Sequence, residues 1–149
     1  MRIALARASI VKRIREKAEM SKKETPMIRW YWHQIGGILV EEFPAVARTP
    51  TCAQRLLDAV ILPKHATRIA HWREVSLKGE EVIVVQAKVS RLGMSLMGQT
   101  IFSAQLIKQF HPASVQAVAL CAADDSVLRP LLEQYPEMKV IVYPGEGAA

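Results

Sequence analysis

Two short apolar segments, each interrupted by polar residues, constrain the fold of this chain most. Residues 56–62 read Leu-Leu-Asp-Ala-Val-Ile-Leu, and residues 81–88 read Glu-Val-Ile-Val-Val-Gln-Ala-Lys. Both are rich in β-branched residues and lie next to turn signals, Pro63 after the first segment and Lys78-Gly79 before the second. Short apolar runs bounded in this way are typical of buried strands. The two segments therefore predict strands at the centre of a sheet.

The polar residues inside these strands need an explanation. Side chains alternate across a strand, so Gln86 and Lys88 are expected on one face of the second strand. By the same rule Asp58 is expected to share a face of the first strand with Leu56 and Val60. Burying an amide without a partner costs roughly 2 to 7 kcal/mol. The carboxylate, the amide and the ammonium therefore need partners or a function.

The rest of the chain predicts an α/β domain. Apolar residues at helical spacing predict a helix over residues 30–43, which Pro44 ends. We expect the two strands to form an antiparallel meander, with a short middle strand at residues 72–77. The later elements are a helix at 92–110, a strand at 115–122, a helix at 127–134 capped by Asp124-Asp125-Ser126, and a strand at 138–143. The expected order is α-β-β-β-α-β-α-β, around a central mixed β-sheet flanked by helices.

Three more polar residues lie at unusual places in this scheme. Glu41 and Glu42 fall in the last turn of the expected first helix, where the helix dipole disfavours carboxylates. Either another group holds one of them, or both are simply exposed. Gln99 lies inside the apolar stripe of the 92–110 helix that should face the sheet. It is either part of a site or a core amide bonded to backbone.

Asp58 followed by Gln86-Ala87-Lys88 resembles the motif of the PD-(D/E)XK nuclease superfamily. That motif is an acidic residue on one strand, then an acidic residue or glutamine, any residue, and lysine on the next strand. The resemblance covers about residues 30–143, and the family's core of helix, three strands, helix and strand matches the expected order. It implies a restriction-endonuclease-like fold and a metal-dependent nuclease. DNA is a better expected substrate than RNA, in a defence, repair or recombination system.

The resemblance also implies a role for each residue of the motif. Asp58, the amide oxygen of Gln86 and the backbone carbonyl of Ala87 would hold Mg²⁺ or Mn²⁺, both of which accept oxygen ligands. Lys88 would position or activate the attacking water. Since glutamine replaces the second acid here, metal binding would be weaker or would depend more on an acid from elsewhere.

An acidic residue on the first helix often completes the site in this family. Glu41 or Glu42 stands at the corresponding place, and Glu42 is preferred because it is next to Phe43 of the apolar stripe. In exonuclease-related members a glutamine on the later helix is followed four residues on by tyrosine. Gln99 is followed by Ser103 instead, which counts against that subgroup.

The excess positive charge of the chain lies in its N-terminal part. The whole chain carries 20 Lys and Arg against 14 Asp and Glu. Residues 1–29 contain nine of these basic residues and three of the acidic ones. We expect residues 1–29 to be a basic amphipathic arm, either solvated or in contact with phosphates or a partner protein, and residues 30–149 to be the nuclease-like domain.

Other features narrow the function classes. No apolar run approaches the ~18 residues of a membrane span, and nothing resembles a secretory signal, so a cytoplasmic protein without a membrane partner is expected. Cys52 and Cys121 are too far apart for a CxxC site. The alternative function is a non-catalytic accessory subunit that binds a partner protein or nucleic acid through its fold and basic arm. A homodimer or a larger complex is expected, because so short a chain has little surface with which to wrap a duplex.

Overall fold

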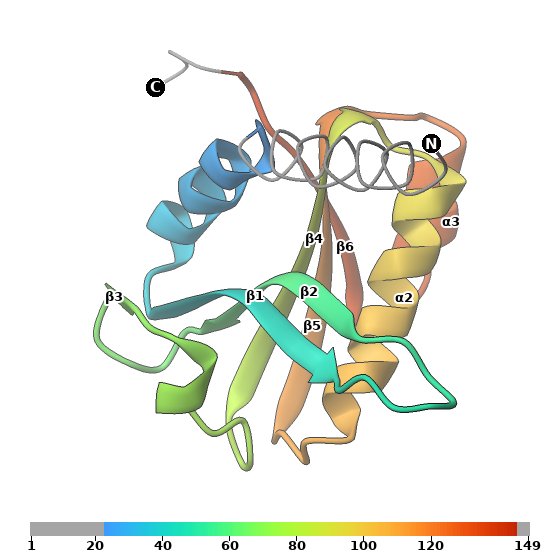
Figure 1. The fold of residues 1–149 in the computed structure, drawn as a ribbon. Coiled ribbons are helices and arrows are strands. Elements are labelled where there is room, and N and C mark those ends of the chain that lie inside the picture. The colour runs from blue at the N-terminus through green and yellow to red at the C-terminus, as the bar shows by residue number, and fades with distance from the viewer. Residues whose placement is uncertain (1–22, 146–149) are drawn as a thin grey trace, which may run out of the picture.

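The computed structural model of the chain describes residues 23–145 as an α/β fold, a six-stranded mixed sheet flanked by helices (Figure 1). The expected α/β class with a central mixed sheet is therefore confirmed. Residues 1–22, most of the expected basic arm, lie outside the described residues. Within residues 23–145 the helices are too short or too polar to traverse a lipid bilayer.

In the described chain one helix precedes three consecutive strands, after which helices and strands alternate. Residues 23–35 form the first helix. The later elements are β1 (Ile38–Val46), β2 (Arg55–Leu62), β3 (Arg68–Ile69), a 3-10 helix (Trp72–Glu74), β4 (Glu81–Arg91), α2 (Met94–Lys108), β5 (Ser114–Ala123), α3 (Leu128–Glu133) and β6 (Met138–Val142). The strand order in the sheet is β3-β1-β2-β4-β5-β6. β2 is antiparallel to β1 and to β4, whereas β4, β5 and β6 are parallel to one another.

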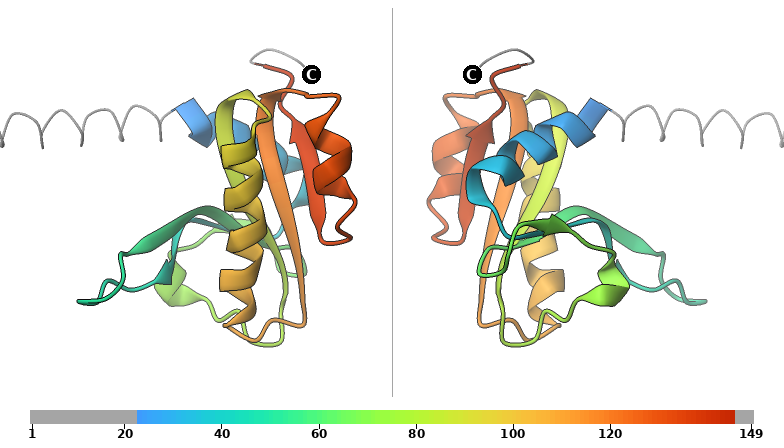
Figure 2. Two further views of the ribbon diagram at one scale, coloured as in Figure 1. Left: turned by 90° about the vertical axis from the view of Figure 1, so that its right-hand side faces the viewer. Right: turned by 90° about the vertical axis from the view of Figure 1, so that its left-hand side faces the viewer.

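The sheet lies between two helical layers (Figure 2). Met27 and Tyr31 of the first helix pack against Ile83 and Val85 on one face of β4. On the other face the core contains Val84 with residues of α2, and further along it contains Leu132 of α3. The strict alternation expected for β4 is therefore confirmed from Val82 to Ala87.

The helix expected over residues 30–43 is wrong in its second half. Helical structure ends at residue 35, and Gly36 and Gly37 follow with φ of 78° and 79°. A Cβ atom on Gly37 would lie 2.2 Å from the carbonyl oxygen of Leu62, so only glycine fits there. The chain turns at this pair and continues as strand β1, which puts Glu41 and Glu42 on a strand.

The domain begins earlier than residue 30. Met27 and Ile28 are only 1% and 4% exposed and belong to the core under the first helix. Residues 23–29 are therefore part of the folded domain, and the expected boundary is corrected accordingly.

The middle strand expected at residues 72–77 is also wrong. Trp72–Glu74 form a 3-10 helix, whose first turn is capped by His71 Nδ1, which accepts a hydrogen bond from Arg73 N. A two-residue strand, β3, lies before it and pairs parallel with β1 at the edge of the sheet. The four later elements are confirmed to within a few residues. Asp125 Oδ1 caps α3 by accepting from the backbone N–H groups of Val127 and Leu128.

The alternation of faces breaks at one place in β1 and β2. Leu57 and Val60, three residues apart, belong to the same core cluster, as do Val40 and Phe43 opposite them. Between them Glu42 adopts a φ of 53°. The expectation that Leu56 shares the buried face is therefore wrong, and Leu56 is 40% exposed. Beyond this irregularity residues 43–57, called the ribbon from here on, stand away from the rest of the sheet (Figure 2).

Candidate functional site

β2 leaves β4 at Asp58. The two strands pair only at Ala59 with Val85, Val60 with Val84, and Ile61 with Ile83. The next residue of β4 that faces β2 is Ala87, and its backbone N–H donates a hydrogen bond of 2.8 Å to Asp58 Oδ2. A side-chain carboxylate thus takes the place of the backbone acceptor that a continued ladder would supply. Asp58 is held at the point where the sheet splits.

The carbonyl of Ala87 points to the same opening. Paired residues of an antiparallel ladder exchange both of their backbone hydrogen bonds, so the N–H and C=O of one residue face the same neighbouring strand. The N–H of Ala87 faces β2, and its carbonyl therefore does as well. No backbone register pair joins Ala87 to β2. This carbonyl is consequently placed beside the Asp58 carboxylate.

Gln86 and Lys88 flank Ala87 on β4, at positions that alternation predicts on the face of Val84. Gln86 is 7% exposed, whereas Lys88 is exposed. The Gln86 amide makes no hydrogen bond with another residue of the described range. Every fully buried polar side-chain atom in that range has a hydrogen-bond partner, so the Gln86 amide is not fully buried. Its amide end therefore reaches solvent. Lys88 likewise forms no ion pair within residues 23–145, so both groups are available to a ligand.

Glu24 joins this site from the first helix. Burial of the half-buried side chain is the main reason why its pKa is raised from 4.5 to about 7. The negative charge of Asp58 raises this pKa further, and the Lys88 ammonium lowers it in part. Glu24 is therefore close enough to both Asp58 and Lys88 for their charges to act on it.

The pKa of Asp58 is also raised. Burial raises the pKa of its carboxyl, the hydrogen bond from Ala87 opposes this, and the charge of Glu42 raises the pKa again. Two carboxyl groups, Asp58 and Glu24, therefore have pKa values above their ordinary values. Such perturbed groups are typical of functional sites, although structural clusters show them too.

Glu41 and Glu42 do not occupy the helical position expected for them. Arg29 Nε and Nη2 donate to Glu41 Oε1 at 3.1 and 2.9 Å, so Glu41 is held in an ion pair away from the opening. Glu42 is exposed and reaches the site only through its effect on Asp58. Glu24 is the acid that the first helix contributes, and it lay upstream of the expected domain boundary.

Gln99 does not lie in the buried stripe of α2. It is exposed, and its neighbour Thr100 takes the buried position and donates to the carbonyl oxygen of Leu96 at 2.7 Å. The buried stripe runs through Leu96, Thr100, Ser103, Ala104 and Ile107. The expected register of this helix was therefore displaced by one residue at Gln99.

A signal for Glu24 was present in the sequence. Met27, Ile28, Tyr31 and Trp32 recur at the spacing of one helical face, and all four are buried. This stripe begins before residue 30, and an acid one turn upstream of it would have been a candidate.

Comparison with protein-family models, curated proteins and solved structures found no match to this chain. Among the described residues, no three His, Cys, Asp or Glu side chains are grouped so that they could hold a metal ion. The donors gathered at the opening are instead two carboxylates, one amide and one backbone carbonyl. The site's chemistry has to be argued from these groups.

Proposed function

We propose that this chain is a metal-dependent nuclease, acting on DNA rather than RNA, with a restriction-endonuclease-like core. The observation that carries the proposal is that Asp58 is held where β2 leaves β4, and that its charge and that of Lys88 both act on Glu24. Gln86 adds an amide whose end reaches solvent. Carboxylates, neutral oxygens and one cation are the groups that phosphodiester hydrolysis requires.

The order of elements supports the same proposal. Apart from β3 and the 3-10 helix, which lie between β2 and β4, the order is a helix, three antiparallel strands (β1, β2 and β4), the helix α2 and the parallel strand β5. This is the order of helix, three strands, helix and strand that the resemblance to the PD-(D/E)XK superfamily implies. The acid, the glutamine and the lysine lie on the two strands that the motif requires.

The donor set fits a hard divalent cation. Magnesium prefers oxygen ligands, keeps several waters and needs only one or two protein carboxylates. Glu24, Asp58, the Gln86 amide and the Ala87 carbonyl would hold Mg²⁺ or Mn²⁺. When bound, the cation would bind the scissile phosphate and lower the pKa of a water.

Each residue has a task that follows from its surroundings. The hydrogen bond from Ala87 occupies Asp58 Oδ2 and leaves Oδ1 free for a ligand. Because Gln86 is neutral, Glu24 supplies the second negative charge, and its pKa of about 7 lets it exchange a proton at neutral pH. The Lys88 ammonium orients the attacking water or offsets the charge that develops on the phosphate.

The test is cleavage of plasmid, linear duplex and single-stranded DNA, and of RNA, with Mn²⁺ and with Mg²⁺. Asp58→Asn, Lys88→Ala and Glu24→Gln should each lower the rate by about 10²-fold or more. Glu41→Gln is the matched control, because it removes a carboxylate that is held by Arg29, and its rate should stay within about threefold of the wild type.

Two results would refute the proposal. One is the absence of cation-dependent cleavage of any substrate by the wild-type chain. The other is cleavage that survives in Asp58→Asn and in Lys88→Ala, which would mean that the activity arises elsewhere.

A second candidate is a non-catalytic subunit that keeps the fold and binds nucleic acid or a partner protein. It is favoured by glutamine at position 86 and by the lack of a three-ligand group within residues 23–145. It predicts no cleavage by the wild type, together with binding that Asp58→Asn and Lys88→Ala leave unchanged.

A further inference from the structure

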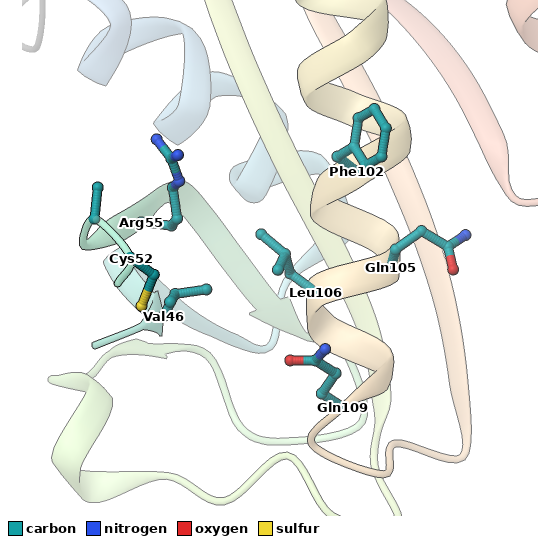
Figure 3. Close-up of a pocket in the computed structure, with 8 residues that line it drawn as sticks. Val46, Cys52, Arg55, Phe102, Gln105, Leu106 and Gln109 are labelled. Carbon is teal, nitrogen blue, oxygen red and sulfur yellow. The ribbon is translucent and has the colours of Figure 1, made fainter. Parts of the chain in front are cut away.

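A groove of about 400 Å³ lies between the ribbon and α2. One wall is the ribbon and the start of β2, and the other is the C-terminal half of α2 (Figure 3). The lining residues are Val46, Cys52, Ala53, Arg55, Phe102, Gln105, Leu106 and Gln109. Figure 3 shows Leu106 and Gln109 reaching from α2 toward the ribbon, whereas Gln105 projects to the other side of the helix.

Neither wall of the groove carries a carboxylate. The sequence has no Asp or Glu from Phe43 to Leu57, nor from Val82 to Ala123. Arg48 and Arg55 on the ribbon are exposed, and neither forms an ion pair with any residue in the part of the chain described. The groove therefore has the charge that suits an anionic polymer.

Phe102 presents an uncovered aromatic ring at this groove. It is 69% exposed, and it stacks on no other ring within residues 23–145. Covering this ring with a ligand would remove apolar surface from water, which is favourable. Gln109 adds an exposed amide, which can donate to and accept from the edge of a base.

We propose that this groove binds an unstacked base from a single-stranded stretch of nucleic acid, an inference that rests on the proposed nuclease function. The ring of Phe102 stacks on the base, and Arg55 neutralises the adjacent phosphate. The volume of about 400 Å³ is near the lower end of the 300–1,000 Å³ range of ligand sites, which suits one nucleotide and excludes a duplex.

Strand β2 contributes one residue to the groove and one to the candidate site. Arg55 and Asp58 lie three residues apart on β2, which corresponds to about 10 Å along a strand. In the proposed complex, a nucleic-acid strand whose base occupies the groove would extend along β2 toward Asp58. The groove would select single-stranded or frayed DNA as the substrate.

The experiment measures binding of the full chain to a fluorescently labelled single-stranded oligonucleotide and to the matching duplex. Fluorescence anisotropy is recorded in EDTA, so that cleavage does not interfere. Phe102→Ala should weaken single-strand binding by about 5- to 150-fold, the range expected for loss of one base–aromatic stack. Phe102→Trp should restore it, because a larger ring keeps the stack.

Met94→Ala is the matched control. Met94 is 78% exposed on the same helix but does not line the groove, so its removal should leave binding unchanged. Thermal unfolding of each variant checks that the fold is intact. Since Phe102 is mostly exposed, Phe102→Ala should unfold at the wild-type temperature within a few degrees.

The outcomes separate this proposal from the nuclease proposal. Loss of binding in Phe102→Ala alone, with preference for the single strand, supports the groove even if no cleavage is ever found. Equal binding by wild type and Phe102→Ala overturns it, even if the chain cleaves DNA. Failure of the wild type to bind either oligonucleotide also overturns it, and would point to a protein partner for the groove.

Discussion

Replacing Glu24 with glutamine should change how the stability of this protein depends on pH. The folded state raises the pKa of Glu24 from 4.5 to about 7, chiefly through burial. Between these two values the folded state binds the proton more tightly than the unfolded state. The free energy of unfolding therefore falls as pH rises from 4.5 to 7, and stays low above pH 7.

The size of the effect follows from the pKa difference. A rise from 4.5 to about 7 corresponds to about 3.4 kcal/mol, at 1.36 kcal/mol for each pH unit. Because the side chain is only half-buried, solvent screening reduces this to about 1–2 kcal/mol. Glu24→Gln keeps the shape of the side chain and removes its titration. The variant should therefore be more stable than the wild type by about 1–2 kcal/mol at pH 8 and equal to it at pH 4.

Urea unfolding of both proteins at a series of pH values, without divalent cations, measures this difference. The difference between the two proteins isolates Glu24 from Asp58, whose raised pKa adds a pH dependence of the same sign to both. Glu81→Gln, which removes an exposed carboxylate from the start of β4, is the control for loss of one charge. Parallel stability curves for wild type and Glu24→Gln between pH 4 and 8 would refute the reasoning.

Two further predictions concern the turn before β1 and the helix α2. Gly37→Ala should destabilise the protein by about 3 kcal/mol or more, because φ is +79° and the new Cβ would meet the Leu62 carbonyl. Gly98→Ala should instead stabilise the protein by about 0.5–1 kcal/mol, because no atom lies within 4 Å of the new Cβ. Equal urea midpoints for these two variants would contradict this account. Trp32→Phe should cost about 0.5–1.5 kcal/mol in urea unfolding, because it removes the 2.9 Å hydrogen bond from Trp32 Nε1 to the carbonyl of Gly37, which keeps the 3.2 Å bond from Arg68 N. An unchanged midpoint would show that the bond from Arg68 satisfies this carbonyl without the indole.

The central strands could be predicted because one local rule decides them. Residues 82–87 are buried on both faces, and a short run rich in β-branched and aliphatic residues is typical of a strand in that environment. The positions of Gln86 and Lys88 follow from strict alternation along β4. Alternation fails in β2, because an irregularity at Asp58 puts Leu57 and Val60, three residues apart, on the same buried face. No local sequence signal marks that position.

The first helix shows why Glu24 was not predicted from the sequence. Trp32, Ile35, Leu39 and Phe43 recur at helical spacing, but the first two lie on a helix and the last two on strand β1. The spacing is a coincidence of two elements joined by Gly36 and Gly37. A single helix expected over residues 30–43 runs across this pair, and the candidate acids Glu41 and Glu42 then lie after the turn. The acid that meets Asp58 lies before it, and tertiary packing alone brings it there.

Because β2 and β4 pair over only a short length, the sheet is divided into two units, one with β1 and β2 and the other with β4 and β5. The two units should differ in the free energy of local opening. β4 and β5 are paired from Glu81 to Arg91, whereas β2 holds β4 only from Ala59 to Ile61. Proteins open locally with free energies that differ between such units. Amide hydrogens of β1 and β2 should therefore exchange with solvent before those of β5. A cation or a nucleotide strand bound across this division would join the two units, and slower exchange of the Ala87 amide would report that closure.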